Sequence, residues 1–273
     1  MSEAMGTALR AVGRHRSLFV GLAMLCLFLV AGFLLPLPYV PTEPNVSAQL
    51  AGPSAQHWFG TDASGFDVFS RTIAAARRDL PVALAGGLVS LVLGVPLGLL
   101  VGAKNRWSEH AMRVLDVFQA FPLVILSIAV VTILGDNLGN VVAAIALINI
   151  PRFMRLIRSE VLSLREKRFV EAARAMGASN GRVIFRHLLP NVMDVALVQF
   201  SIATANALIV IAALGFLGVG VSPPTPDWGL MIQQGAQQMT TGQWWTVVFP
   251  GLAILAAVTC FNAIAAGLNP SKR

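Results

Sequence analysis

Charged residues are scarce in this chain. Asp, Glu, Lys and Arg make up 12% of its 273 residues, whereas hydrophobic residues make up 56%. Soluble domains carry about 25% charged residues, and the mean hydropathy here is +0.71. A soluble fold is therefore excluded, and we expect bilayer hydrocarbon to surround most of the molecule.

Residues that build catalytic centres are scarce as well. Cys26 and Cys260 each lie in an apolar stretch, far apart in sequence, and are interpreted as packing residues. The four His residues are scattered, and neither a metal site nor a catalytic triad can be assembled from them. The chain also lacks the Gly-x-x-x-x-Gly-Lys-Ser/Thr loop that cradles nucleotide phosphates. We expect no bound cofactor, no enzymatic activity and no ATP hydrolysis by this chain itself.

Long apolar stretches, by contrast, are abundant. A membrane-spanning helix needs roughly 20 such residues, because an unpaired backbone group in lipid costs several kcal/mol. The predicted spans are 17–37, 80–103, 112–134, 140–157, 191–213 and 245–267. The fourth is the weakest, because Arg152 and Arg155 load its last turns with charge. Alternating strand patterns are absent, so the prediction is an all-α integral membrane protein with six transmembrane helices.

The basic residues predict the orientation of these helices. With the N-terminus inside, the inner segments hold 17 of the 20 Lys and Arg residues, and only Arg71, Arg77 and Arg78 lie outside. Both termini are therefore expected in the cytoplasm, and the net charge of +7 reflects topology rather than nucleic-acid binding. A cleaved signal peptide is the alternative for the first span. The apolar run of this span is too long for a signal peptide, and it ends in Pro36-Leu-Pro38 rather than in a cleavage site. A first span that stays in the membrane is therefore the better interpretation.

These predictions divide the chain into segments. A cytoplasmic N-terminus at 1–16 and a first helix at 17–37 precede an external segment at 38–79, whose part from 46 to 79 we interpret as a small lid. A core of five helices at 80–267 and a cytoplasmic tail at 268–273 follow. Within this core, glycines on the second span predict a close-packed helix face, either within the chain or between subunits. These glycines are Gly86, Gly87, Gly94, Gly98 and Gly102.

A cytoplasmic loop at 158–190 has an unusual composition. Val161, Leu164 and Arg168 share one face of a predicted interfacial helix that continues to Ala175. Gly177 then ends it in the left-handed conformation, and Ser179 or Asn180 caps a second short helix. Two short helices joined by a glycine elbow favour docking on another protein. The alternative is a surface helix that lies in the lipid headgroups.

Three motifs in this chain resemble those of a known family. Glu171-Ala-Ala, with Gly177, Ile184 and Leu189-Pro190 following, resembles the "EAA" loop of binding-protein-dependent ABC importer permeases. The stretches 57–71 and 214–230 resemble signatures of the dipeptide, oligopeptide and nickel permeases, specifically of their second, "C-type", subunit. The likeness covers about residues 10–270.

Two departures from the family pattern stand out. Phe66 occupies a position that is often basic, so an ion pair made there in relatives is absent. The C-terminal stretch 261–270 lacks the usual acidic and basic run, which puts a contact of the tail with the ATPase in doubt.

The resemblance implies a type I ABC importer permease fold in the bacterial inner membrane. It also implies a heterodimer with a second permease, two cytoplasmic ATPase subunits that hold ATP and Mg, and an extracytoplasmic solute-binding protein. The substrate stays open among dipeptides, oligopeptides, nickel chelates and haem. An ion-driven carrier that uses Asp116 and Asp194 is the alternative from another class.

The resemblance further implies roles for particular residues. The residues expected to couple to the ATPase are Glu171, Ala172, Ala173, Ala175, Gly177, Ala178, Ile184, Leu189 and Pro190. Those expected at an external gate or binding-protein contact, which includes the loop 214–243, are Gly60, Thr61, Asp62, Asp67, Pro224, Asp227, Trp228 and Gly229. For this loop the alternative is a surface loop in which Trp228, Trp244 and Trp245 are interfacial anchors.

Polar residues within the spans are candidates for the translocation path. They are Gln119, Asn149, Gln199, Thr204 and Asn206. Hydrogen bonding between packed helices is the alternative explanation for each of them.

Overall fold

The chain folds into an elongated bundle of long helices. The computed structural model describes residues 2–102 and 106–269, so most of the predicted tail lies outside the described residues. The long helices are α1 (Ser2–Leu34), α2 (Val68–Val101), α5 (Leu138–Arg165), α8 (Leu189–Phe216) and α10 (Trp245–Leu268). No β-strand occurs within the described ranges. By length and apolar composition, five described helices are long enough to cross a membrane, or six if one bent pair counts as a span.

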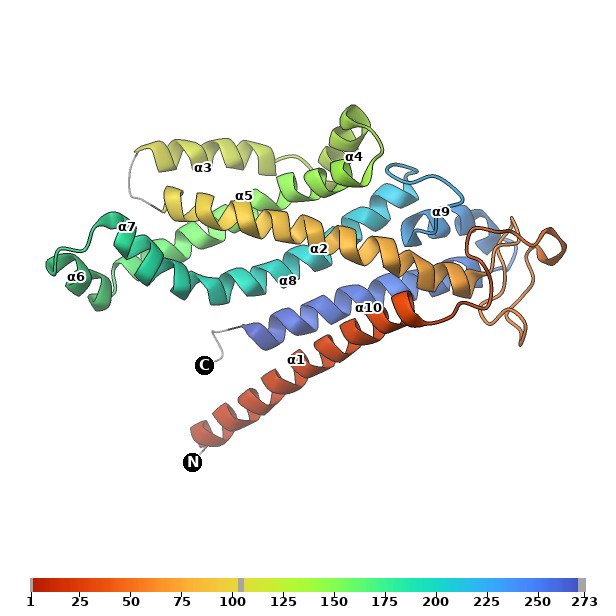
Figure 1. Cartoon of the computed structure of the whole chain (residues 1–273), viewed down its shortest axis with the longest axis horizontal. Coiled ribbons are helices and arrows are strands. Elements are labelled where there is room, and N and C mark those ends of the chain that lie inside the picture. The colour runs from red at the N-terminus through yellow and green to blue at the C-terminus, as the bar shows by residue number, and fades with distance from the viewer. Residues whose placement is uncertain (1, 103–105, 270–273) are drawn as a thin grey trace.

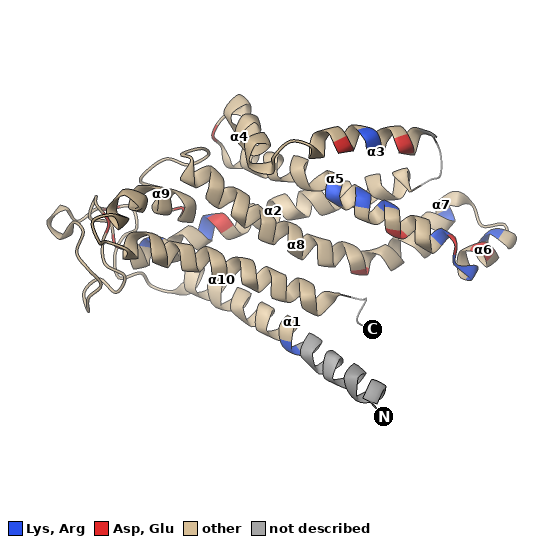
Figure 2. Cartoon of the chain, turned by 180° about the vertical axis from the view of Figure 1, so that it is seen from behind, with Lys and Arg blue, Asp and Glu red and all other residues tan. Residues whose placement is uncertain are grey.

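Most of the short elements gather at the two ends of this bundle, whereas the helices between residues 106 and 134 lie along its side (Figure 1). At one end, which we call the knob end, lie α6 (Arg168–Ala175), α7 (Asn180–Val183) and a π-helical turn, η2 (Ile184–Leu188). At the other, the loop end, lie residues 38–67 with the 3₁₀ turn η1 (Val46–Ala48), together with α9 (Trp228–Met239). Lys and Arg residues of α5, α6 and α7 crowd toward the knob end (Figure 2).

The predicted third span, 112–134, is wrong as a single helix. It is divided into α3 (Arg106–Gln119) and α4 (Leu123–Leu134), whose axes meet at 89°. Pro122 lies at the break with φ −58° and ψ 129°. Proline lacks a backbone N–H and disfavours helical geometry in the residue before it, so the helix breaks at Phe121-Pro122.

Two further boundaries differ from the predictions. Helix α2 begins at Val68 rather than at 80, because the Asp67 side chain caps it by accepting a hydrogen bond from the Ser70 N–H. Helix α5 continues to Arg165, so residues 158–165 belong to a long helix and not to the predicted interfacial helix. Val161 and Leu164 are buried against the bundle core, which keeps this part of α5 packed.

The predicted glycine face on α2 forms a seam within the chain. At Gly86, Gly98 and Gly102, an added Cβ would come within 3.0 Å of a side chain of α5. The facing residues of α5, Ile145, Ile157 and Val161, are nearly inaccessible to solvent. Small residues let membrane helices approach closely, and packing supplies much of their attraction. The absence of side chains on one helix therefore fixes its distance from the other.

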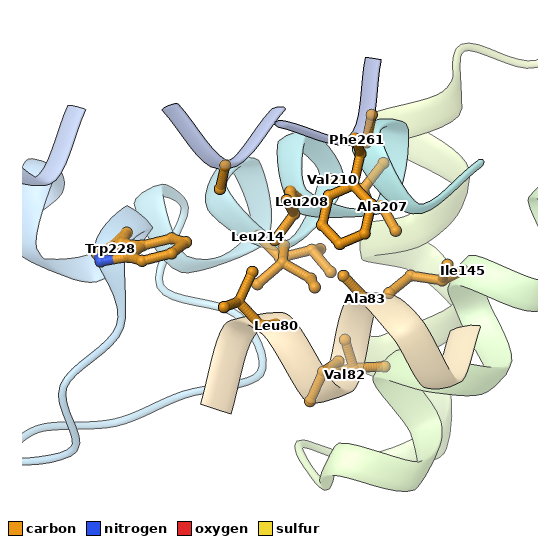
Figure 3. Close-up of a cluster of buried hydrophobic side chains, with 14 of the residues drawn as sticks. Leu80, Val82, Ala83, Ile145, Ala207, Leu208, Val210, Leu214, Trp228 and Phe261 are labelled. Carbon is orange, nitrogen blue, oxygen red and sulfur yellow. The ribbon is translucent and has the colours of Figure 1, made fainter. Parts of the chain in front are cut away.

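Next to this seam, α2, α5, α8 and α10 share a buried apolar cluster (Figure 3). Leu80, Ile145, Leu208 and Phe261 point into it from the four helices, and Trp228 of α9 closes it toward the loop end. Helix α1 packs outside this core along α10, where Gly21 lies against Cys260 and Ile264.

A substitution tests the seam. In Gly98→Val the new Cβ would lie 2.7 Å from the Ile157 Cβ, so we expect overpacking to cost about 1–3 kcal/mol and to lower the thermal unfolding temperature in detergent. The control is Gly251→Val on α10, where no atom lies within 4 Å of an added Cβ. Equal unfolding temperatures for the two variants would contradict the seam.

Candidate functional site

The knob end is built around a glycine turn. Gly177 has φ +83°, which confirms the predicted left-handed elbow. The Ala178 N–H donates to the Ala173 carbonyl at 3.0 Å, and the Gly177 N–H donates to the Arg174 carbonyl at 2.9 Å. This pair of bonds is the Schellman pattern, which satisfies the last carbonyls of a helix. Ser179 then caps α7 by accepting from the Arg182 N–H, as predicted, so both sides of the elbow are fixed by hydrogen bonds.

The predicted coupling residues divide between an outer face and an inner anchor. Glu171, Ala172, Ala175 and Gly177 are exposed, as is Pro190. The inner part consists of buried Ala173 and of Ala178, Ile184 and Leu189, which are half-buried and pack against the apolar cluster beneath the knob. The motif therefore both presents a surface and attaches that surface to the bundle.

Sequence reasoning missed the largest side chains on this surface. Met176 is 81% exposed, Phe185 is 72% exposed and Phe169 is 42% exposed. Three exposed bases, Arg168, Arg174 and Arg186, accompany them. The signal for this patch is present in the sequence. Large apolar residues alternate there with bases in a segment too short to bury them all. An exposed apolar patch with a polar rim is typical of a protein interface.

Glu171 is exposed on α6, and no described side chain forms an ion pair with it. Arg168 and Arg174, each three residues from Glu171 in the sequence, are therefore not paired with it. The carboxylate is free to meet a base on another protein.

The knob continues directly into α8. The Leu189 N–H donates to the Ile184 carbonyl, one residue farther back than in an α-helix, and this bond makes η2 a π-helical turn. Pro190 follows and has no N–H to donate. Residues 180–216 thus form one helical segment from knob to loop end, with a wider turn at its base.

At the loop end, His57 and Asp67 tie the external segment to α2. The His57 Nδ1 lies 2.9 Å from the Asp67 Oδ1, and both side chains are more than nine-tenths buried. Tyr39 stacks on the His57 ring, with 4.6 Å between the ring centres. The second Asp67 oxygen caps α2. One carboxylate therefore both begins the helix and fixes the loop before it.

Arg71 is fully buried beside this cap. Its Nη1 donates to the Pro41 carbonyl at 3.3 Å and to the Pro224 carbonyl at 3.2 Å. The guanidinium carbon lies 4.2 Å from the centre of the Phe66 ring, a cation–π arrangement that gains strength when it is desolvated. Phe66, the departure from the family pattern, thus supports the guanidinium with its ring face instead of an ion pair.

A second network joins α2 to the start of α9. Arg78 forms an ion pair with Asp227 at 2.6 Å and also donates to the Gly220 carbonyl at 2.6 Å. Asp79 accepts from the Trp228 backbone N–H at 3.1 Å, and the indole of Trp228 donates to the Thr72 carbonyl at 2.8 Å. These contacts join segments about 150 residues apart. They also give hydrogen-bond partners to buried polar groups, whose burial without partners would cost free energy.

The predicted gate residues are therefore mostly internal. Gly60, Thr61, Asp67, Asp227, Trp228 and Gly229 are all buried, Asp62 is half-buried and only Pro224 is exposed. Six of them therefore do not lie on the surface of this chain, and their role at an external gate or in contact with a binding protein stays a prediction. The alternative of Trp228 as an interfacial anchor is wrong, because this side chain is only 1% exposed.

Asp62 does reach an open space. It lines a polar cleft of about 290 Å³ with Gln233, Gln234 and Gln237 of α9. Burial raises the pKa of the Asp62 carboxyl, although hydrogen bonds from the Phe66 and Ser64 backbones and the nearby Arg71 act against this rise. The loop 214–243, predicted without a helix, contributes α9 to this cleft.

Four of the five path candidates separate into two pairs. Asn149 and Thr204 are buried and donate to carbonyls of their own helices, those of Ile145 and Phe200. Gln199 and Asn206 are half-buried and lie seven residues apart on α8, which places them on one helix face. Gln119, the fifth candidate, is exposed at the end of α3, so it and the second pair are the candidates with accessible side chains.

Comparison with known proteins decides the family. Residues 94–273 match the family described as "Binding-protein-dependent transport system inner membrane component". The chain belongs to this family. It is therefore a multi-pass inner-membrane permease subunit of an ABC importer, and not its ATPase.

Relatives of this permease subunit agree with that assignment. It is 42% identical to the dipeptide transport system permease protein DppC of Alkalihalophilus pseudofirmus over 96% of the chain and 87% of that protein. It is 40% identical to the glutathione transport system permease protein GsiD of Pectobacterium atrosepticum, over 80% of the chain and 72% of that protein. Its fold resembles a solved structure of the MetNI methionine ABC transporter with a TM-score of 0.54 and 18% identity, over 72% of this chain and 97% of that one.

Thermal unfolding of variants tests the network that joins Arg78 to Asp227 in this permease. Asp227→Ala leaves a guanidinium with little access to water and no carboxylate, so we expect a loss of about 3–5 kcal/mol and a lower thermal unfolding temperature. Asp136→Ala, at an exposed site, is the control. The double variant Arg78→Gln with Asp227→Ala should lose less than the sum of the two single variants, and strict additivity would contradict the pair.

Proposed function

We propose that this chain is the membrane-spanning subunit of an ATP-driven importer of peptides. The relatives that it matches over most of their length are named for dipeptide and glutathione transport, and this supports peptides over nickel chelates or haem. The partners in this proposal are a second, homologous permease, two cytoplasmic ATPase subunits that hold ATP and Mg, and an extracytoplasmic solute-binding protein.

Membership of a binding-protein-dependent family disfavours the ion-driven carrier. The Asp116 carboxylate assigned to that carrier is an exposed partner of Arg155.

The knob end faces the cytoplasm in this proposal. The bases of α5, α6 and α7 gather there (Figure 2), and cytoplasmic segments of membrane proteins carry an excess of Lys and Arg. The described parts of α1 and α10 nearest the chain termini also point toward this half of the bundle (Figure 1). The loop end then faces the binding protein.

The observation that carries the proposal is the construction of the knob. A rigid elbow presents Met176, Phe185 and Glu171, and η2 joins it to α8 without an intervening loop. When two ATPase subunits close, they would draw the knobs of the two permeases together. Because α8 is continuous with the knob, this movement would reach Gln199 and Asn206 on the translocation path.

The buried residues of the loop end act as a scaffold in this proposal. The ion pair of Arg78 with Asp227 and the bonds of Trp228 hold α9 against α2. Exposed Pro224 and the cleft at Asp62 are then the contacts for the binding protein. These buried residues would move as a unit with α9, because the ion pair and hydrogen bonds that hold them lie within this chain and do not depend on the binding protein.

Charge reversal at the knob tests coupling. We expect Glu171→Lys to abolish ATP-dependent uptake of peptide into proteoliposomes that hold the complete transporter, because the carboxylate would no longer meet a base on the ATPase. Membrane insertion, measured as the amount of folded protein, should stay unchanged, since Glu171 forms no ion pair with the residues that the structure describes. Normal uptake by this variant would overturn the coupling role of Glu171.

The elbow offers a matched pair of glycines. An added Cβ would meet no atom within 4 Å at either Gly177 or Gly181, but only Gly177 has a positive φ. Gly177→Val should therefore strain the elbow by about 1–2 kcal/mol and reduce the ATPase activity that the loaded binding protein stimulates. Gly181→Val, inside α7, should leave this stimulation intact. Identical stimulation in both variants would show that the elbow geometry is not needed.

A further inference from the structure

An arginine lies near the middle of a membrane-spanning helix. Helix α5 extends over 28 residues, and Arg152 is almost equidistant from its ends. Charged side chains deep in a span are costly, so they pair with other groups or line a pathway. The sequence-based span 140–157 placed Arg152 in its last turns, and the helix itself continues for eight residues beyond that boundary.

Arg152 has little to satisfy its charge. Its Nη1 lies 3.4 Å from the amide oxygen of Asn149, a neutral acceptor at the limit of hydrogen bonding. Among the described residues, no carboxylate lies within ion-pair distance of it. One turn further along, Arg155 does pair with Asp116 of α3. The two neighbouring arginines therefore differ: one has a counter-ion and the other lacks one.

Arg152 is one of the residues that line a cavity at the elbow between α3 and α4. Phe118, Gln119 and Phe121 line it from the elbow, and Leu126, Leu147 and Ile148 add aliphatic walls from α4 and α5. The 89° bend at Pro122 opens this space beside α5. Its volume of about 100 Å³ holds several water molecules, and hence a carboxylate with its adjoining carbons, but not a whole peptide.

We infer that the Arg152 cavity binds the terminal carboxylate of a transported peptide. A guanidinium recognises a carboxylate through paired N–H donors, and the aromatic and aliphatic walls suit the apolar part of the last residue. Gln119 supplies an amide at the mouth of the cavity for the adjoining peptide group. The inference rests on the proposed peptide transport. It adds a residue on this chain that recognises the end of the peptide rather than its sequence.

Uptake measurements test the role of Arg152. The complete transporter is reconstituted in liposomes, and uptake of the peptide that its binding protein carries is measured at saturating ATP. We expect Arg152→Gln to reduce the rate about tenfold, as loss of a charged hydrogen bond does, and Arg152→Lys to restore part of it. Arg155→Gln, at a 50% exposed side chain outside the cavity, is the matched control and should transport normally.

A cross-linking measurement leaves Arg152 itself unchanged. Benzoylphenylalanine introduced at Leu147 is irradiated in nanodiscs with radiolabelled alanyl-alanine, or with its C-terminal amide. We expect cross-links to the free acid and at least tenfold fewer to the amide. Equal labelling by both would overturn the inference. Cross-linking to phosphatidylglycerol, in nanodiscs that contain it, would assign the cavity to lipid phosphate and overturn it as well.

The two proposals can fail separately. Absence of ATP-dependent uptake of any peptide by the unmodified transporter would refute the peptide function. Normal uptake by the unmodified transporter and by Arg152→Gln alike would refute only the carboxylate site.

Discussion

The close approach of α2 to α5 is the constraint on which the rest of the structure depends. Gly86, Gly98 and Gly102 leave no room for a side chain between the two helices. Apolar side chains gain little by leaving lipid for another apolar surface, so packing contacts have to hold such helices together. This seam fixes α5, which carries the Arg152 cavity and ends next to the knob. It also fixes α2, whose first turns carry Arg71, Arg78 and Asp79.

The two ends of the bundle meet partners in different ways. At the knob end, backbone hydrogen bonds around Gly177 hold a surface whose side chains are free, and Met176 and Phe185 stay exposed. At the loop end, the charged side chains are used internally, and buried carboxylates hold Arg78 and cap α2 and α9. One end is preorganised by its backbone and the other by its side chains.

The sequence predicted what depends on local pattern. Apolar length indicated the spans, and small residues with a glycine indicated the elbow, because both features are local. The break at Pro122 was missed since the apolar pattern continues across it. The start of α2 was missed because Arg71, Arg78 and Asp79 look unsuited to a membrane helix until their partners are known. Those partners lie in the loop before α10, and no local pattern indicates such long-range pairs. The exposure of Phe185 and the isolation of Arg152 likewise depend on tertiary packing.

The long reach of the loop-end bonds has a consequence for how the protein is made. Arg71 and Arg78 emerge from the ribosome about 150 residues before Pro224 and Asp227, their partners. Because synthesis proceeds from the N-terminus, the first turns of α2 are made well before the segment that holds Pro224 and Asp227. The network is therefore complete only after the segment before α10 has been synthesised. A product truncated before Gly220 would lack the carboxylate partner of Arg78, whereas Arg71 would keep its contacts with Pro41 and Phe66.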